Sequence, residues 1–190
     1  MEIKERDNLP VNINMQMVVR PEDADQIIPL TKLAKEIRPN YLIFKHTADS
    51  VDHALGIDYT KYSNLFPLFK EAESYSDETF RVATKWSRIQ DEGKRDYKRC
   101  MGPAFILQMS GNGLITVCGQ KFNEKFKKLH IGNICETRFK DMYLSDRYWE
   151  VLNYLRSDAW DSQRSCGSNC LQTNSNSWLN HWMEGRKQFP

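Results

Sequence analysis

The chain has 190 residues, of which 40% are hydrophobic and 27% charged, as in globular proteins with one domain or two small ones. Its net charge of +2 is too close to balance to indicate binding to nucleic acid or to an acidic membrane. No segment reaches the roughly 18 apolar residues of a membrane span, and the polar start is unlike a signal peptide. We therefore expect a cytoplasmic protein with neither nucleic acid nor a membrane as partner.

The first segments follow the order strand, helix, strand. Residues 11–19 alternate apolar and polar side chains and end fully apolar, which predicts a strand entering a buried sheet. Residues 21–37 predict a helix that opens with a proline and acids and carries apolar residues on one face. Residues 41–44 predict a second strand. Since a parallel βαβ unit is stable only within a larger covered sheet, the start of the chain is typical of the closing part of a βα barrel. The apolar edge of the strand at 11–19 predicts that the chain associates with other chains if no further strand covers it.

The next segments lead to a boundary between two domains. Residues 47–58 predict a loop, and a short helix follows around residues 62–69. Residues 80–89 alternate and contain β-formers, which predicts a further strand. The charged segment 91–96 is the most suitable linker between the two halves of the chain. We therefore expect an α/β chain, α+β overall, with one domain at residues 1–92 and a second at 93–190.

All five cysteines lie in the second half of the chain, where a β-hairpin brings the first ones together. Two short apolar runs within residues 105–118 flank a turn at Gly111-Asn112. Folding about this turn places Cys118 opposite roughly residue 105, so that Cys100 needs only a local bend to approach it. A small domain built of this hairpin and helices, with cysteines as ligands, is the expected architecture.

A second close pair, Cys166-x3-Cys170, supplies two more thiols across a tight turn. Four soft thiolates suit either a tetrahedral zinc ion or an iron-sulfur cluster, and their spacing does not choose between the two. The candidate metal ligands are Cys100, Cys118, Cys166 and Cys170. We interpret Cys135, which precedes an amphipathic segment, as a small buried hydrophobic residue.

The segment from Cys100 to Cys118, together with His-Ile-Gly-Asn-Ile at 130–134 and the pair at 166–170, resembles the C-terminal extension of radical SAM enzymes called the SPASM or Twitch domain. Gly113-x4-Cys118 matches the signature half-motif of that family. The resemblance implies that the four cysteines hold an auxiliary iron-sulfur cluster, of which Twitch domains have one and SPASM domains two.

Departures from the family pattern limit what this chain holds. The resemblance runs from about residue 100 to 182, but Ser157 and Trp160 occupy the places of a Cys-x2-Cys pair, and no cysteine follows Cys170. The chain therefore resembles the smaller version, with one auxiliary [4Fe-4S] cluster. The Cys-x3-Cys-x2-Cys motif of radical SAM enzymes is also absent, because Thr173 stands in its third position. The resemblance therefore implies that the chain is one part of an oxidoreductase or modifying enzyme and that it is inactive alone.

The resemblance also implies partners for the first domain. Radical SAM enzymes place a partial barrel before the auxiliary domain, so we expect an N-terminal barrel portion, or another chain that supplies it, together with a peptide or small-molecule substrate. Arg20, Lys45 and His46 follow or end predicted strands, where barrels have their active sites. These three residues are candidates for contact with substrate or with S-adenosylmethionine, which binds only if the missing barrel is supplied. The other interpretation is a solvated loop.

Three helices are expected after the hairpin. Residues 139–143 predict a short turn, Ser145 is a suitable N-cap for a helix with Trp149, Leu152 and Leu155 on one face, and a last helix begins near residue 175. Trp178 and Trp182 lie one helical turn apart. We expect them either to belong to the core or to shield the cluster from water.

Two alternatives to the cluster remain at the level of sequence. In the first, the chain is a non-enzymatic protein-binding module with a structural four-cysteine zinc site. In the second, it is a fragment without metal or activity.

Overall fold

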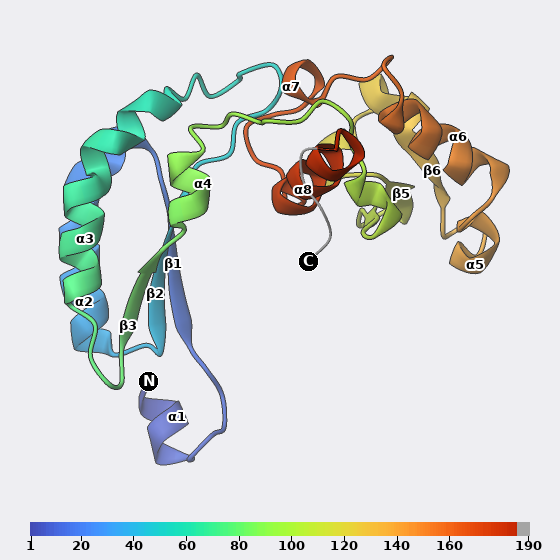
Figure 1. Cartoon of the computed structure of the whole chain (residues 1–190). Coiled ribbons are helices and arrows are strands. Elements are labelled where there is room, and N and C mark those ends of the chain that lie inside the picture. Colours follow the sequence, from blue (N-terminus) through green and yellow to red (C-terminus); the bar gives the residue numbers. More distant parts are fainter. Residues whose placement is uncertain (186–190) are drawn as a thin grey trace. The chain divides into compact units, whose positions relative to one another are not determined.

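The computed structural model describes residues 1–185, which form two compact units. The first unit comprises residues 1–49 and 53–93, and the second comprises residues 50–52 and the chain from residue 94 onward. Each unit combines helices with a three-stranded sheet, which confirms the α+β class (Figure 1). Within residues 1–185, no helix is long and apolar enough to cross a membrane.

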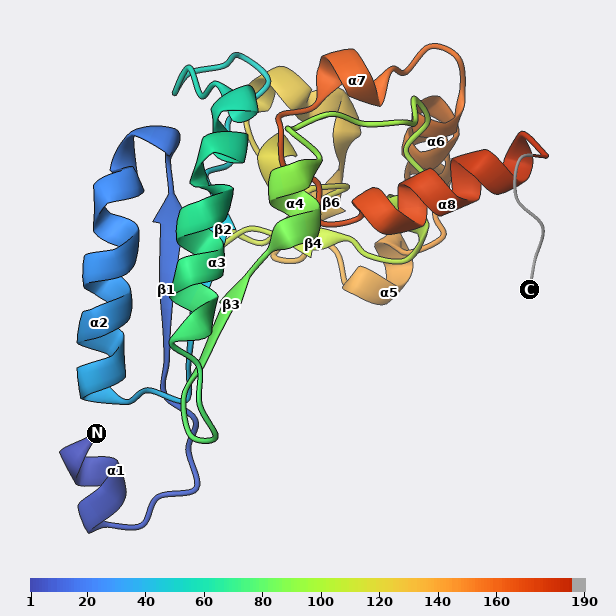
Figure 2. The same ribbon diagram turned by 60° about the vertical axis from the view of Figure 1, so that its left-hand side comes forward.

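The first unit contains a parallel sheet in the order β1-β2-β3, covered by helices α2 and α3 on one face (Figures 1 and 2). The expected βαβ unit is confirmed, and a second one, β2-α3-β3, follows it directly. The elements of this unit are α1 (Glu2–Arg6), β1 (Asn14–Val19), η1 (Pro21–Gln26), α2 (Ile27–Ile37), β2 (Tyr41–His46), η2 (Tyr59–Leu65), α3 (Phe66–Ser74), β3 (Arg81–Thr84) and α4 (Trp86–Gln90).

The expected strand at 80–89 is wrong in its second half, because β3 ends at Thr84 and α4 begins at Trp86. The Trp86 ring packs edge-on against Phe66 and Phe69, with centroids 5.4 and 6.0 Å apart. Its indole nitrogen also donates a hydrogen bond to Glu73 on α3. These contacts with α3 fix the turn of the chain after Thr84. The alternation of apolar and polar residues at 80–89 does not predict such contacts, because they involve a distant segment.

Tyr62 joins the ends of β1 and β2 inside the core of the first unit. The side chain is fully buried, and its hydroxyl donates to the carbonyl of Val19 and accepts from the amide of Thr47 at 3.0 Å. The adjacent core is formed by residues such as Leu42, Phe44 and Phe69. The phenol therefore adds a hydrogen bond to each of two buried backbone groups, which also pair with each other at 3.0 Å.

The second unit contains an antiparallel sheet in the order β4-β5-β6. The predicted hairpin is confirmed, with Gln108 opposite Thr116 and Gly113 at a φ of +84° in the turn. Strand β6, which the sequence did not indicate, adds to the other side of β5. The elements are η3 (Gly102–Ala104), β4 (Gln108–Met109), β5 (Leu114–Thr116), η4 (Gly119–Lys121), η5 (Glu124–Leu129), β6 (His130–Asn133), α5 (Phe139–Met142), α6 (Asp146–Arg156), α7 (Ser162–Ser165) and α8 (Thr173–Met183).

The helices α6 and α8 occur as expected, and Leu152 and Leu155 are buried on α6 as predicted, but the aromatic residues of both helices differ from the prediction. Ser145 caps α6 by accepting from the amide of Tyr148, yet Tyr148 is buried and Trp149 is 41% exposed. On α8 the predicted aromatic face is wrong as well, because Trp182 is 42% exposed and the buried residues are Asn176 and Asn180. A polar face turned inward indicates that α8 covers something other than an apolar core.

We expect Tyr62→Phe to lower the free energy of unfolding by about 0.5–1.5 kcal/mol, because it removes the hydrogen bonds of the phenol to the Thr47 amide and the Val19 carbonyl, which keep their bond to each other. Urea denaturation measures this loss. Tyr41→Phe, at an exposed position of β2, is the control and should change stability by less than about 0.5 kcal/mol. Equal stabilities of the two variants would contradict the role assigned to Tyr62.

Candidate functional site

Four of the five cysteines line one cavity in the second unit. The cavity has a volume of ≈ 40 Å³. Its cysteines come from three segments: one lies two residues before η3, one lies directly before η4, and two lie in the loop between α7 and α8. They are Cys100, Cys118, Cys166 and Cys170, all of them free thiols. The structure thus brings together the four thiols that the sequence singled out, while their role as metal ligands stays a prediction.

Backbone and side-chain contacts hold these segments in place. The amide of Cys100 donates to the carbonyl of Leu155 on α6 at 3.0 Å, which anchors the first cysteine to a buried helix. The side chain of Gln120 accepts from the amide of Gly167 at 3.2 Å and donates to the carbonyl of Asn169 at 3.0 Å. Gln120 therefore ties the turn at Cys118 to the loop that carries the second pair of cysteines.

Asn176, on the inner face of α8, forms the floor of the site. Its Oδ1 accepts from the amides of Met101 and Gly102 at 2.6 and 2.8 Å. Its Nδ2 lies 3.8 Å from the sulfur of Cys100 and 3.9 Å from that of Cys170, at donating distance. One fully buried amide thus fixes the loop after Cys100 and directs an N–H group at two thiols.

Asn180 extends this contact by one turn of α8. Its Nδ2 donates to the carbonyl of Arg99 at 2.9 Å, and its Oδ1 accepts from the amide of the same residue. The sequence reasoning missed both asparagines. Their spacing of four residues on one helical face was a usable signal, because buried amides at that spacing need polar partners on the facing segment.

Burial favours the protonated form of three of these thiols, Cys100, Cys118 and Cys166. It raises the pKa of Cys100 to about 12, and the neighbouring thiols Cys166, Cys170 and Cys118 add to the increase. Burial also raises the pKa values of Cys118 and Cys166. A metal that binds here must therefore displace protons, which makes its binding dependent on pH.

Two cationic side chains line the same cavity, Lys121 and Arg95. Lys121 is only 2% exposed, and its ammonium group donates to the carbonyl of Ser165. Arg95 donates from Nη2 to the carbonyl of Gly167, whereas its buried Nε has no partner in the described part of the chain. Both cations lower the pKa values of Cys118 and Cys166. The two cations therefore partly offset the effect of burial on these thiols.

Within residues 1–185, no group of three or more His, Cys, Asp or Glu side chains is arranged to hold a metal ion. The four thiols share a cavity in this structure without converging on a single point.

The fifth cysteine lies elsewhere, and its predicted burial is wrong. Cys135 is exposed, in the turn that follows β6. Its amide donates to Oδ1 of Asn133 at 2.9 Å, so the chain turns there before α5 begins. The turn ends the alternation of β6 and leaves the thiol on the surface.

The candidate residues of the first unit lie at one end of its parallel sheet. Val19 pairs with His46 and Val18 with Lys45, so that Arg20 follows directly at the same edge. The guanidinium of Arg20 is bound to Asp23, with Nη2 and Oδ1 2.8 Å apart.

His46 differs from its two neighbours in being buried, at 7% exposure. It lies edge-on to the rings of Tyr59 and Tyr62, and burial lowers its pKa, so the ring is neutral at neutral pH. Successive strand residues face opposite sides of a sheet, which separates Lys45 from His46. The three residues therefore share an edge but do not form one group, and their contact with a substrate stays a prediction.

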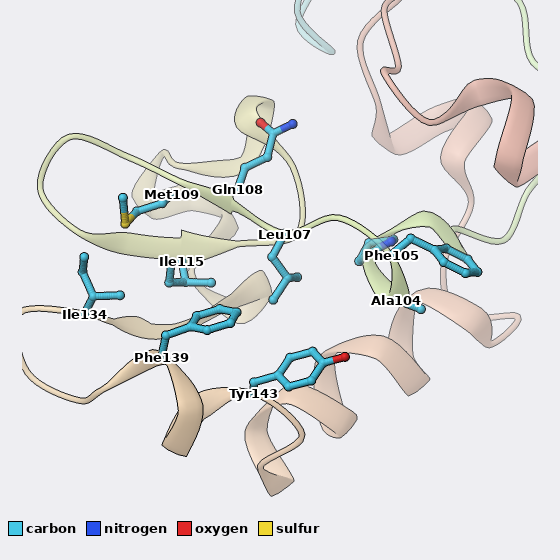
Figure 3. A pocket seen from close by; sticks show the side chains of 10 residues that line it. Ala104, Phe105, Leu107, Gln108, Met109, Ile115, Ile134, Phe139 and Tyr143 are labelled. Carbon is cyan, nitrogen blue, oxygen red and sulfur yellow. The ribbon is translucent and has the colours of Figure 1, made fainter.

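A second, larger pocket adjoins the hairpin, with a volume of ≈ 420 Å³. Figure 3 shows Phe139 and Tyr143 on one side of it, facing Leu107 and Ile115. Its lining is otherwise apolar except for Gln108, which also lines the cavity of the four thiols. The two cavities are thus neighbours.

Comparisons with known proteins give little further information. No protein-family model matches the chain, and no curated protein matches it. Among solved structures, that of BtrN in an open conformation matches with a TM-score of 0.29 and 13% sequence identity, over 85% of this chain and 92% of that chain. A TM-score this low does not establish a shared fold.

We expect Asn176→Ala to lower the free energy of unfolding by about 2 kcal/mol or more, because the buried amides of Met101 and Gly102 lose their acceptor. Asn174→Ala is the matched control, since Asn174 is exposed on the same helix. Urea denaturation of the metal-free proteins measures both. A loss no larger in the Asn176 variant than in the control would show that α8 does not hold the loop after Cys100.

The metal-free protein should lose stability at alkaline pH. The folded chain holds the proton of Cys100 more tightly than the unfolded chain, so this contribution is complete below the ordinary thiol pKa of 9.0 and disappears as the pH rises towards 12. Urea denaturation at about pH 8 and about pH 11 should show a fall in wild type that exceeds the fall in Cys100→Ser by about 1 kcal/mol or more. Identical falls in the two proteins would contradict the raised pKa.

Proposed function

We propose that the second unit binds one auxiliary [4Fe-4S] cluster through Cys100, Cys118, Cys166 and Cys170, and that the chain is the C-terminal portion of a radical SAM protein. The observation that carries the proposal is that four free thiols from three separate segments line one cavity. Thiols that serve only as small apolar residues have no need to share a cavity. A cluster there would supply electron transfer or hold a substrate in position.

The residues around the cavity fit a thiolate-bound cluster. Thiolates are the ligands of iron-sulfur clusters, and N–H groups directed at the sulfurs help to set the potential. Asn176 provides such a group to Cys100 and Cys170. The unpartnered Nε of Arg95 is a further donor at the cavity wall. These groups suit an anionic, sulfur-rich occupant.

A structural zinc site with the same four cysteines is the alternative, in which the chain acts as a protein-binding module. Because both zinc and an iron-sulfur cluster bind cysteine thiolates, chemical analysis of the bound metal distinguishes the two.

The assignment to radical SAM proteins is supported by the sequence resemblance and by the parallel sheet of the first unit. In this sheet β1 is an edge strand, and Val18 is exposed on it. An open edge of this kind suits addition of the missing barrel strands, either from an N-terminal portion or from another chain. The edge of the sheet that carries Arg20, Lys45 and His46 would then lie near S-adenosylmethionine or a peptide or small-molecule substrate.

The chain purified without oxygen should contain about four irons and four sulfides, and both Cys118→Ser and Cys166→Ser should lose most of the iron and the brown colour. Removal of one thiolate leaves an iron without its protein ligand, which makes the cluster labile. Iron, sulfide and zinc analysis with visible absorption measures the outcome.

Cys135→Ser is the matched control, because Cys135 is exposed and lies outside the cavity. It should keep the full iron content. Undiminished iron in the Cys118 and Cys166 variants would overturn the proposed ligand set. One zinc ion and no iron in the wild-type chain would overturn the cluster and support the structural zinc site.

A further inference from the structure

Lys121 is a charged side chain enclosed in the second unit beside the cavity of the four thiols. Its ammonium group donates to the carbonyl of Ser165 and lies 3.9 Å from the ring centroid of Phe126 and 5.8 Å from that of Trp160. A lysine that is 2% exposed has lost nearly all of its hydration, which is costly unless another charge compensates for it.

The described contacts of this ammonium group contain no anion. A carbonyl oxygen and two aromatic rings offer only partial negative charge, which stabilises a cation less than a carboxylate does. Burial lowers the pKa of Lys121, and the acidic groups that oppose this shift are the thiols Cys166 and Cys118. These thiols balance the lysine only when they are ionised, as they are when bound to a metal.

We infer that Lys121, together with Arg95, offsets the negative charge of the group that the four thiolates hold, and thereby raises the reduction potential of a cluster bound there. The inference rests on the proposed function. It assigns to Lys121 the role of a positioned charge that does not itself ligate the iron.

The direction of the effect follows from electrostatics. Four thiolates give the bound cluster a net negative charge, and reduction adds one more electron to it. A fixed cation stabilises the reduced form more than the oxidised form, and the interaction is stronger in a poorly hydrated interior than in water. Removal of the cation therefore makes the cluster harder to reduce.

The test compares Lys121→Met with Lys125→Met in the full chain, purified without oxygen and loaded with its cluster. Lys125 is the matched control, because its ammonium group lies 5.1 Å from the same Phe126 ring but its side chain is half exposed and paired with Asp52. The midpoint potential is measured by redox titration with electron paramagnetic resonance. We expect a more negative potential in Lys121→Met, a smaller change in Lys125→Met, and a potential near that of wild type in Lys121→Arg.

Each outcome decides between the inference and its alternatives. A potential in Lys121→Met equal to that of wild type, or more positive, overturns the inference while leaving the cluster itself established. A wild-type chain without iron overturns the proposed function instead. If Lys121→Met does not fold, as judged by circular dichroism, Arg95→Gln provides the measurement: a negative shift supports the inference, and an unchanged potential overturns it.

Discussion

The second unit depends on the balance of charge around one small cavity. Four thiols line it, and burial opposes the ionisation of Cys100, Cys118 and Cys166, since a charge taken out of water must be compensated nearby. Lys121 and Arg95 provide that compensation from the cavity wall. As long as these thiols are protonated, the described contacts of Lys121 include no full counter-charge. The occupant that we propose, which binds thiolates, would relieve both conditions.

The rest of the second unit holds the three cysteine segments at this cavity. The hairpin β4-β5 brings the segment around Cys118 back towards the residues that precede β4. Gln120, which follows the hairpin, is hydrogen-bonded to the Cys166–Cys170 loop, and α8 contributes two buried asparagines to the site. The asparagines explain why α8 turns a polar face inward. Their amide groups pair with the backbone at residues 99–102, and Asn176 also reaches two of the sulfurs.

Local patterns in the sequence predicted the parts of the fold that depend on local physics. The hairpin about Gly111-Asn112 and the first βαβ unit were predicted because turn residues and periodicity report on neighbours in the chain. Asn176 and Lys121 were not found, because their significance arises only when distant segments meet. The same reason applies to α4 after Thr84, whose direction is fixed by contacts with α3, and to Cys135, which a turn leaves exposed. Spacing identified the four cysteines, since soft ligands in two close pairs are a chemical signal in themselves.

Native mass spectrometry of the wild-type chain, purified and sprayed without oxygen, tests the central claim most directly. The account predicts a folded protein whose mass exceeds that of the metal-free chain by about four irons and four sulfides, an increment that is lost on acid denaturation. A folded protein with the mass of one added zinc ion, or with no added mass, would contradict it.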